Sequence, residues 1–214
     1  MYIITTCITH RHRSLPERGK KGKMTAIQAF RNFDGHLLIA IQHLLVHDGL
    51  TPFVKAVTTL GNKGFIWIAL ALLMLFFPKT RKAGSVALLA LVISYTFNNL
   101  ILKELFARTR PYDVFDGVQR LIAKPGDFSF PSGHAANSFA AATAMALCLP
   151  KKYGGLLIAL AALIALSRLY LGVHYPSDVL FGGFSGAAMG YIAFRIDGRR
   201  RKNEKAARSR KRKK

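Results

Sequence analysis

Two histidines and one aspartate stand at positions from which they could transfer a phosphoryl group. His174 and Asp178 are four positions apart, so they share one face if the turn at 175–177 leads into a helix. A carboxylate bonded to one imidazole nitrogen fixes the tautomer and leaves the other nitrogen free to attack. With His134 as a second imidazole, one histidine could attack phosphorus while the other protonates the departing oxygen.

Basic residues that suit phosphate oxygens accompany these histidines. Lys103 and Arg110 are seven positions apart, so they share a face if one helix continues until Pro111 stops it. Arginine offers a planar fork to two phosphate oxygens, and lysine offers a movable point charge. Arg168 adds a third cation shortly before His174. Charge stabilisation by these groups would supply most of the rate in phosphoryl transfer.

The tetrapeptide at 131–134, Pro-Ser-Gly-His, predicts the start of a helix. Ser132 is a typical N-cap residue, and Gly133 lets the backbone approach an anion. Free N–H groups and the helix dipole would then point at the same phosphate oxygens. Taken singly, this start, the His–Asp pair and the cations all have ordinary structural explanations. Their combination is what indicates chemistry.

The composition requires a membrane setting for these residues. The chain has 214 residues, a net charge of +22 and a hydrophobic fraction of 51%. Charge gathers in the segments 11–23 and 199–214, and the middle of the chain is apolar, which is typical of a membrane protein. Nucleic-acid binding would explain the basic tails but not the apolar middle, so we expect the tails to contact anionic lipids. The two cysteines, Cys7 and Cys148, form no motif.

Six apolar segments predict an all-α integral membrane protein with a six-helix transmembrane bundle. The runs are 33–46, 64–78 (extended back to 56 across Lys63), 83–102, 135–150, 153–167 and 179–194. The first is the least apolar, because Asp34, His36, Gln42 and His43 interrupt it. The alternative is five crossings with an interfacial first helix.

Basic connections predict the orientation of the spans. The basic residues of these connections are Lys79, Arg81, Lys82, Lys151, Lys152, Arg195 and Arg199. Placing them in the cytoplasm puts both termini inside the cell and the active site at the outer membrane–water interface. Cations at 103, 110 and 168 then lie on the outer side against the usual bias, and a shared anion explains them. The resulting organisation is a basic segment at 1–23, a membrane domain at 24–196 and a basic cytoplasmic tail at 197–214. Gly182, Gly186 and Gly190 predict close helix packing in the last span.

Three motifs together resemble a known family. Lys103-x6-Arg110-Pro111, Pro131-Ser-Gly-His134 and Ser167-Arg168-x5-His174-x3-Asp178 are similar to the three signature motifs of the type 2 phosphatidic acid phosphatase superfamily. The chain looks like a small bacterial member of the phosphatidylglycerophosphatase B kind, in the plasma membrane.

The resemblance implies a role for each residue and no cofactor. His174 would be the nucleophile that forms phosphohistidine, Asp178 would orient it, and His134 would protonate the leaving group. The phosphoryl oxygens would be held by Lys103, Arg110, Ser132, Gly133 and Arg168. Members need no metal, and His36, His43 and His47 do not have the spacing of a zinc site. The short segment 112–130 leaves little room for the cap of larger relatives, which favours an open, lipid-accessible site.

The motifs recognise a phosphate and do not choose the lipid that carries it. We expect phosphatidylglycerol phosphate, with undecaprenyl pyrophosphate as the alternative substrate. A non-catalytic lipid-binding protein is a different class of function, against which the complete set of His134, His174 and Asp178 argues. The sequence does not indicate an oligomeric state.

Overall fold

The chain folds into helices joined by short connections and one long one. A computed structural model describes residues 25–212, and no strand occurs in that range. The α-helices are α1 Ala26–Leu45, α2 Thr51–Leu60, α3 Phe65–Phe76, α4 Arg81–Ser94, α5 Lys103–Phe106, α6 Gly133–Ala146, α7 Lys151–Tyr170 and α8 Pro176–Arg212. Shorter helical pieces are η1 Asn62–Gly64, the π-helical η2 Tyr95–Leu102 and η3 Pro111–Asp113. Helix α8 runs through position 196 without a break, so no change of structure marks the expected domain boundary there.

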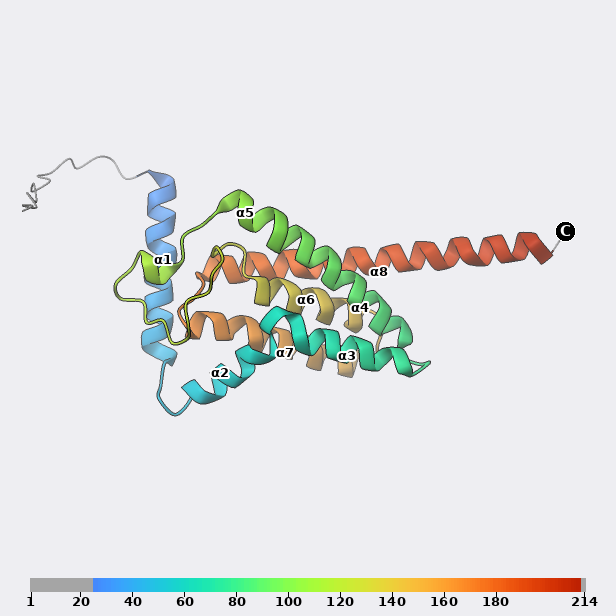
Figure 1. Cartoon of the computed structure of the whole chain (residues 1–214), viewed down its shortest axis with the longest axis horizontal. Helices are drawn as coiled ribbons and strands as arrows, with labels where there is room; N and C mark the ends of the chain where they lie inside the picture. The colour runs from blue at the N-terminus through green and yellow to red at the C-terminus, as the bar shows by residue number, and fades with distance from the viewer. Residues whose placement is uncertain (1–24, 213–214) are drawn as a thin grey trace, which may run out of the picture.

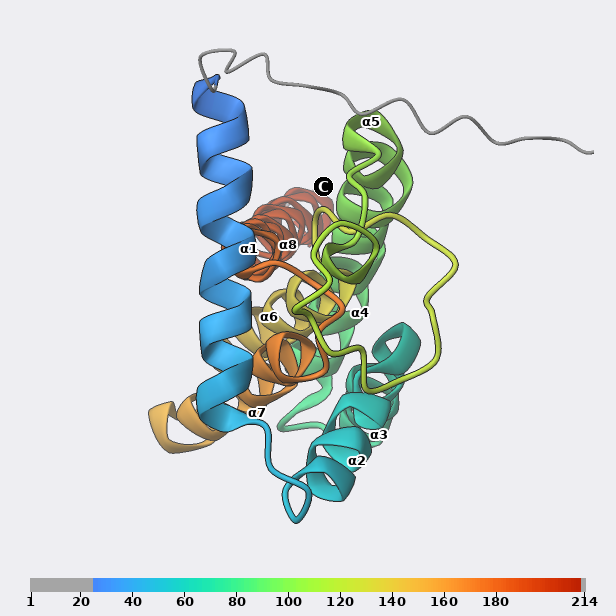
Figure 2. The same cartoon turned by 90° about the vertical axis from the view of Figure 1, so that its left-hand side faces the viewer.

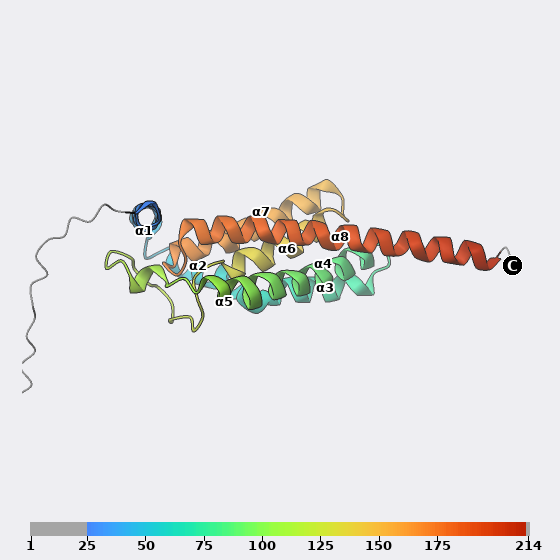
Figure 3. The ribbon, with the colours of Figure 1, turned by 90° about the horizontal axis from the view of Figure 1, so that it is seen from above.

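Helices α2 to α8 run roughly along one axis, and α1 crosses one end of this bundle (Figures 1 and 2). Seen from above, α1 is viewed almost along its own axis while the others lie in the plane (Figure 3). At the opposite end lie the α3–α4 and α6–α7 connections and the basic end of α8. Helix α1 therefore belongs to the end of the bundle that carries the long connection 107–132.

The orientation of α1 bears on the expected six crossings. Three helices are long and apolar enough to span a membrane, or four if the bent pair α2–α3 counts as one; α1 is not among them, and the central α6 is only 14 residues long. The face of α1 that packs on the bundle carries the buried Asp34 and Gln42. Phe30 and Phe33 are exposed on another face. A six-crossing count is not confirmed, and the crosswise α1 agrees with the alternative of an interfacial first helix.

The bundle core depends on small residues of α6. Ala140 and Ala144 are fully buried against Ala87 and Ala90 of α4 and Ala193 of α8. Such side chains let neighbouring helices approach closely in a setting where apolar burial alone does not drive association. The result is a compact centre whose geometry is governed by main-chain contact.

The predicted glycine stripe of α8 is the closest of these contacts. A Cβ atom added at Gly182 would lie 2.7 Å from the Ser132 carbonyl oxygen, and one at Gly186 would lie 2.1 Å from the Ala136 carbonyl oxygen. At Gly190 the nearest atom would be the Ala140 carbonyl oxygen at 2.5 Å. No side chain fits in these positions, so α8 lies directly on the α6 backbone. We call this contact the α6–α8 seam.

The span α2–α3 is bent by 43° at η1. Lys63 and Gly64 have positive φ angles of 51° and 73°, values that glycine adopts freely and lysine rarely does. The apolar run expected at 56–78 is therefore two helices with a charged residue at the break.

Candidate active site

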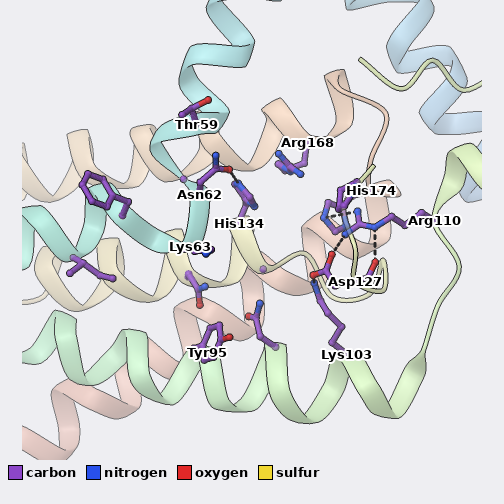
Figure 4. A pocket seen from close by; sticks show the side chains of 17 residues that line it. Thr59, Asn62, Lys63, Tyr95, Lys103, Arg110, Asp127, His134, Arg168 and His174 are labelled. Carbon is purple, nitrogen blue, oxygen red and sulfur yellow. Dashed lines mark hydrogen bonds and ion pairs between the residues drawn. The ribbon is translucent and has the colours of Figure 1, made fainter. Parts of the chain in front are cut away.

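A cavity of about 800 Å³ opens at the end of the bundle near α1 (Figure 4). Its walls come from α2, η1, α3, η2, α5, α6, α7 and the connections at 107–132 and 171–175. Six of the eight residues expected at the site line it: Lys103, Arg110, Gly133, His134, Arg168 and His174. The other two, Ser132 and Asp178, are completely buried behind this wall.

His174 presents one ring nitrogen to the cationic part of the cavity. Its Nε2 lies 3.4 Å from a guanidinium nitrogen of Arg110, and its Nδ1 lies 3.6 Å from Asp178 Oδ2. Burial lowers the pKa of His174 well below its usual value, and the charges of Arg110 and Arg168 lower it further. The imidazole is therefore neutral at physiological pH, as a nucleophile must be.

The expected hydrogen bond between His174 and Asp178 is not made in this structure. The separation of 3.6 Å is too long, and His174 Nδ1 has no hydrogen-bond partner in the described part of the chain. The reason is that other donors take the carboxylate. Asp178 accepts from Arg108 at 2.6 Å, from the Ser129 hydroxyl at 2.5 Å and from the Tyr175 backbone N–H at 3.0 Å.

A chain of ion pairs connects this carboxylate to α1. Arg108 donates to Asp178 with one guanidinium nitrogen and to Asp34 at 2.7 Å with another, and it stacks 3.8 Å from the centre of the Tyr175 ring. Ser177 also donates to Asp34 through its hydroxyl and its backbone N–H. From the sequence alone, Asp34 is predicted only to interrupt the apolar run 33–46, and no partner is assigned to it. A carboxylate in such a run is a signal of a buried partner, because an unpaired one would be very costly.

Lys103 and Arg110 converge on Asp127, a residue that the motifs do not contain. Lys103 Nζ lies 2.5 Å from Asp127 Oδ2, and an Arg110 guanidinium nitrogen lies 2.6 Å from Oδ1. Burial alone would raise the pKa of Asp127, but the hydrogen bonds and charges of Lys103 and Arg110 lower it to about 2. The Asp127 carboxylate therefore forms the ion pairs with Lys103 and Arg110 that a phosphate group would form.

The predicted common helical face for Lys103 and Arg110 is wrong. Helix α5 ends at Phe106, Ala107 adopts a left-handed φ of 40°, and Arg110 is extended. The chain thus turns out of the helix four residues before Pro111. Instead, Arg110 is held by the carbonyl oxygens of Asp127, at 2.9 Å, and Val173, at 2.5 Å. The π-helical η2 directly precedes Lys103, and such irregular turns are frequent at functional sites.

Arg168 reaches the cavity from the end of α7. Its guanidinium donates to the Thr58 hydroxyl at 2.5 Å, and its Nε has no hydrogen-bond partner among the described residues. A buried guanidinium with an unused donor is suited to an anion that enters the cavity.

His134 stands in the first turn of α6, as the tetrapeptide predicts. Ser132 is the N-cap and its hydroxyl accepts from the Ala135 N–H at 3.5 Å, so this side chain stabilises the helix start. His134 Nε2 lies 3.1 Å from Asn62 Oδ1. Since an amide oxygen only accepts, this contact places a proton on Nε2. The ring can give that proton to a leaving oxygen only as an imidazolium, and burial together with the charges of Arg168, His174 and Lys103 lowers the pKa of His134 to about 2. The negative charge of a bound phosphate would favour the imidazolium. A Cβ at Gly133 would lie 2.7 Å from the Asn99 amide nitrogen, so any side chain there would have to displace the Asn99 amide.

Residues 25–212 contain no group of three or more histidine, cysteine or acidic side chains arranged to hold a metal. His36 packs edge-on against Phe115, 5.9 Å between ring centres, rather than joining other possible ligands. Cys148 is a free thiol, and Cys7 lies outside the described residues.

Comparison with known proteins identifies a family for the part of the chain that carries the three motifs. The family model of the PAP2 superfamily matches residues 83–202. An undecaprenyl-diphosphatase from Sulfolobus acidocaldarius is 31% identical over 75% of this chain and 75% of its own length. A decaprenylphosphoryl-5-phosphoribose phosphatase from Mycobacterium tuberculosis is 35% identical over 79% of this chain and 93% of its own length.

Two solved structures share the fold. The transmembrane PAP2-type phosphatidylglycerolphosphate phosphatase of Bacillus subtilis has a TM-score of 0.67 at 27% identity, with 80% of this chain and 87% of that one covered. Aquifex aeolicus LpxE has a TM-score of 0.67 at 28% identity, with 75% and 93% covered.

Proposed function

The chain belongs to the PAP2 superfamily of membrane lipid phosphatases, and on that premise we propose that it hydrolyses a lipid phosphate through a phosphohistidine at His174. The observation that supports this most directly is the position of His174 Nε2. It lies in the cavity at 3.4 Å from Arg110, and its other nitrogen is directed at the buried Asp178. His134 lines the same cavity, so an acid and a nucleophile face one space.

The proposed reaction has two halves. In the first, His174 Nε2 attacks phosphorus, the bond from phosphorus to the lipid oxygen breaks, and that oxygen takes the Nε2 proton of the His134 imidazolium, which becomes a neutral imidazole. Lys103, Arg110 and Arg168 stabilise the charge on the three remaining oxygens, for which Lys103 and Arg110 must exchange Asp127 for the substrate. In the second half, His134 accepts a proton from water as the water attacks the phosphohistidine. Inorganic phosphate then leaves and both imidazoles are restored.

A phosphate-release assay on the purified protein in detergent tests the activity and the nucleophile. His174→Ala should abolish turnover, whereas His43→Ala, on an exposed position of α1, should not change it. Activity of His174→Ala within about tenfold of the parent would remove His174 from this role, since losing a nucleophile costs far more. A parent protein that releases no phosphate from any lipid would favour the non-catalytic, lipid-binding alternative.

The role of His134 is tested through the leaving group. His134→Ala should lose about 10²–10⁴-fold with an alkyl phosphate, whose alkoxide needs a proton, and much less with a nitrophenyl phosphate. Equal losses with both would mean that His134 binds phosphate instead of protonating the leaving oxygen.

Two lipid phosphates are the leading substrates. Phosphatidylglycerol phosphate is supported by the structural similarity to the Bacillus subtilis enzyme, and undecaprenyl pyrophosphate by the Sulfolobus relative and by Bacillus subtilis BcrC, which is 31% identical over 72% of this chain. These comparisons support undecaprenyl pyrophosphate and phosphatidylglycerol phosphate equally. Initial rates on both lipids under matched detergent conditions would rank them.

We also propose that the cavity faces the outside of the cell and the opposite end of the bundle the cytoplasm, where the basic part of α8 meets anionic lipids. In a variant with Cys7 and Cys148 replaced by serine, a cysteine at Gly117 should react with an impermeant reagent in intact cells, and one at Ala206 should not. The opposite pattern would reverse the orientation. A cysteine at Gln28 separates the two topologies, because it is reachable from outside only if α1 does not cross.

A further inference from the structure

The cavity continues beyond His134, away from the nucleophile. In Figure 4, Asn62 and Lys63 lie on the side of His134 opposite to His174 and Arg110. Both residues line the cavity, and Asn62 touches His134 directly through its amide oxygen at 3.1 Å. In the proposed reaction this is the side on which the leaving group must lie, because His134 protonates it.

Lys63 is placed here by an unfavourable backbone conformation. Its φ angle is 51°, and it stands in the break of the bent span α2–α3. A left-handed non-glycine residue costs free energy, and a charge within a membrane span costs more, so both features together mark a functional position. Within residues 25–212, Lys63 makes no hydrogen bond or ion pair, and the NH₂ group of Asn62 likewise has no partner. Both residues are exposed, so the three donors of the ammonium and the two of the amide are open to a ligand.

The net positive charge of the described cavity lining exceeds the charge of one phosphate monoester. Its described lining holds four cations and a single carboxylate; these are Lys63, Lys103, Arg110, Arg168 and Asp127. Lys103 and Arg110 pair with Asp127, and Arg168 lies with them near His174. A bound phosphate monoester carries between one and two negative charges, which these three cations can neutralise. Lys63 is then left without a counter-charge.

Next to Lys63 the cavity lining changes from polar to apolar and aromatic side chains. Phe65 and Ile68 of α3 and Tyr95 of η2 belong to the cavity wall, and all three are exposed. An apolar chain could therefore leave the cavity between α3 and η2 toward the lipid. This path passes Lys63, so a group attached between the scissile phosphate and the lipid tail would lie against its ammonium.

We propose that Lys63 and Asn62 form a second anion subsite, which binds a second phosphorus group carried on the leaving side of the substrate. This inference rests on the proposed lipid phosphatase activity and narrows its substrate class. Two chemistries share the feature: a lipid diphosphate, which leaves as a lipid monophosphate, and a phosphodiester lipid that carries a terminal phosphate, such as phosphatidylglycerol phosphate. A lipid monophosphate that leaves as a neutral alcohol does not use the subsite.

Matched substrate pairs test the subsite in the purified full-length protein. Farnesyl diphosphate and farnesyl phosphate differ only in the second phosphate, and phosphatidylglycerol phosphate and phosphatidic acid form the equivalent phosphodiester pair. Lys63→Gln should lower kcat/KM about tenfold or more for the doubly phosphorylated member of at least one pair, because a charge-assisted hydrogen bond is lost. For farnesyl phosphate and phosphatidic acid the change should stay within about threefold, which also shows that the variant is folded.

Two further variants exclude general effects. Lys63→Arg keeps the charge and should retain most of the activity on the doubly phosphorylated lipids. Lys55→Gln removes an exposed charge from the same span, outside the cavity, and should behave as the parent. A loss confined to the farnesyl pair identifies the second anion as the second phosphoryl group of a diphosphate. A loss confined to the phosphatidylglycerol phosphate pair identifies it as a phosphodiester. Equal losses on both members of each pair would mean that Lys63 is a surface charge toward the membrane and would overturn the subsite, as would no loss on any substrate. A parent inactive on all four lipids would instead refute the lipid phosphatase activity itself.

Discussion

Asp127 holds the cations that a phosphate must use, so its charge should weaken anion binding. Lys103 and Arg110 contact its two carboxylate oxygens at 2.5 Å and 2.6 Å. Because the pKa of Asp127 is lowered to about 2, the group is ionised at every practical assay pH. Asp127→Asn keeps the size of the side chain and the backbone carbonyl that accepts from Arg110 at 2.9 Å, and removes only the charge. We expect this variant to bind phosphate more tightly.

The magnitude follows from the exposure of the carboxylate. Two unit charges about 4 Å apart interact with about 4 kcal/mol at the effective dielectric of a protein surface. Asp127 is 48% exposed in its side chain, so solvent screening reduces this to about 1 kcal/mol. That free energy corresponds to about a fivefold lower inhibition constant for inorganic phosphate, a competitive product. KM for the lipid should fall in the same proportion.

The assay is phosphate inhibition of lipid hydrolysis, measured for the parent, Asp127→Asn and Asp113→Asn. Asp113 is the matched control, because it pairs with Lys124 near the same connection, outside the cavity. Its substitution removes an equal charge and should leave the inhibition constant unchanged. Weaker phosphate binding in Asp127→Asn would refute the reasoning, since it would mean that the carboxylate orders the two cations instead of competing for them. A similar gain in Asp113→Asn would attribute the effect to net charge alone.

Three further predictions concern the frame around the site. Asp34→Asn should lower kcat about tenfold with KM changed less than about threefold, because Asp34 reaches Asp178 through the shared Arg108 and the adjacent Ser177 and does not contact the cavity. A lower melting temperature with unchanged kcat would contradict this. Gly186→Ala should lower the free energy of unfolding by about 1–3 kcal/mol or more in detergent, because its Cβ would lie 2.1 Å from a carbonyl oxygen, whereas Gly155→Ala meets nothing within 4 Å and should not. The pKa of His174 is lower in the folded protein than in the unfolded chain, so below pH 6.5 the unfolded chain binds a proton that the folded protein does not. The contribution of His174 to stability is therefore full above pH 6.5 and falls as the pH decreases. The melting temperature of His174→Gln should vary less between pH 7.5 and 5 than that of the parent.

Local signals predicted the parts of the site that are close in sequence. The helix start at Gly133 and the approach of His174 to Asp178 depend on turns of a few residues, which residue types specify directly. The glycine stripe likewise predicted a close helix contact without naming the partner, and α6 supplies it.

The sequence could not identify partners that the fold brings from far away. Asp34, Asn62 and Asp127 are the examples, and each belongs to a segment without a motif. Their positions follow from the crosswise α1, the break in α2–α3 and the path of the long connection, all of which depend on tertiary packing. The prediction for Lys103 and Arg110 failed for a local reason, since a left-handed Ala107 has no signature in the residue types.

The α6–α8 seam has a consequence for motion during turnover. His134 stands at the start of α6 and His174 just before α8, so the seam joins the supports of the two histidines that we propose as acid and nucleophile. At Gly182, Gly186 and Gly190 the contact is with backbone atoms, so no side chain there could change rotamer and let the helices slide past one another. This pair of helices is thus a static frame, and the displacement needed to admit a lipid and release phosphate must occur on the opposite wall. On that wall, in the proposed reaction, Asp127 must release Lys103 and Arg110, and the bent α2–α3 span lines the same cavity.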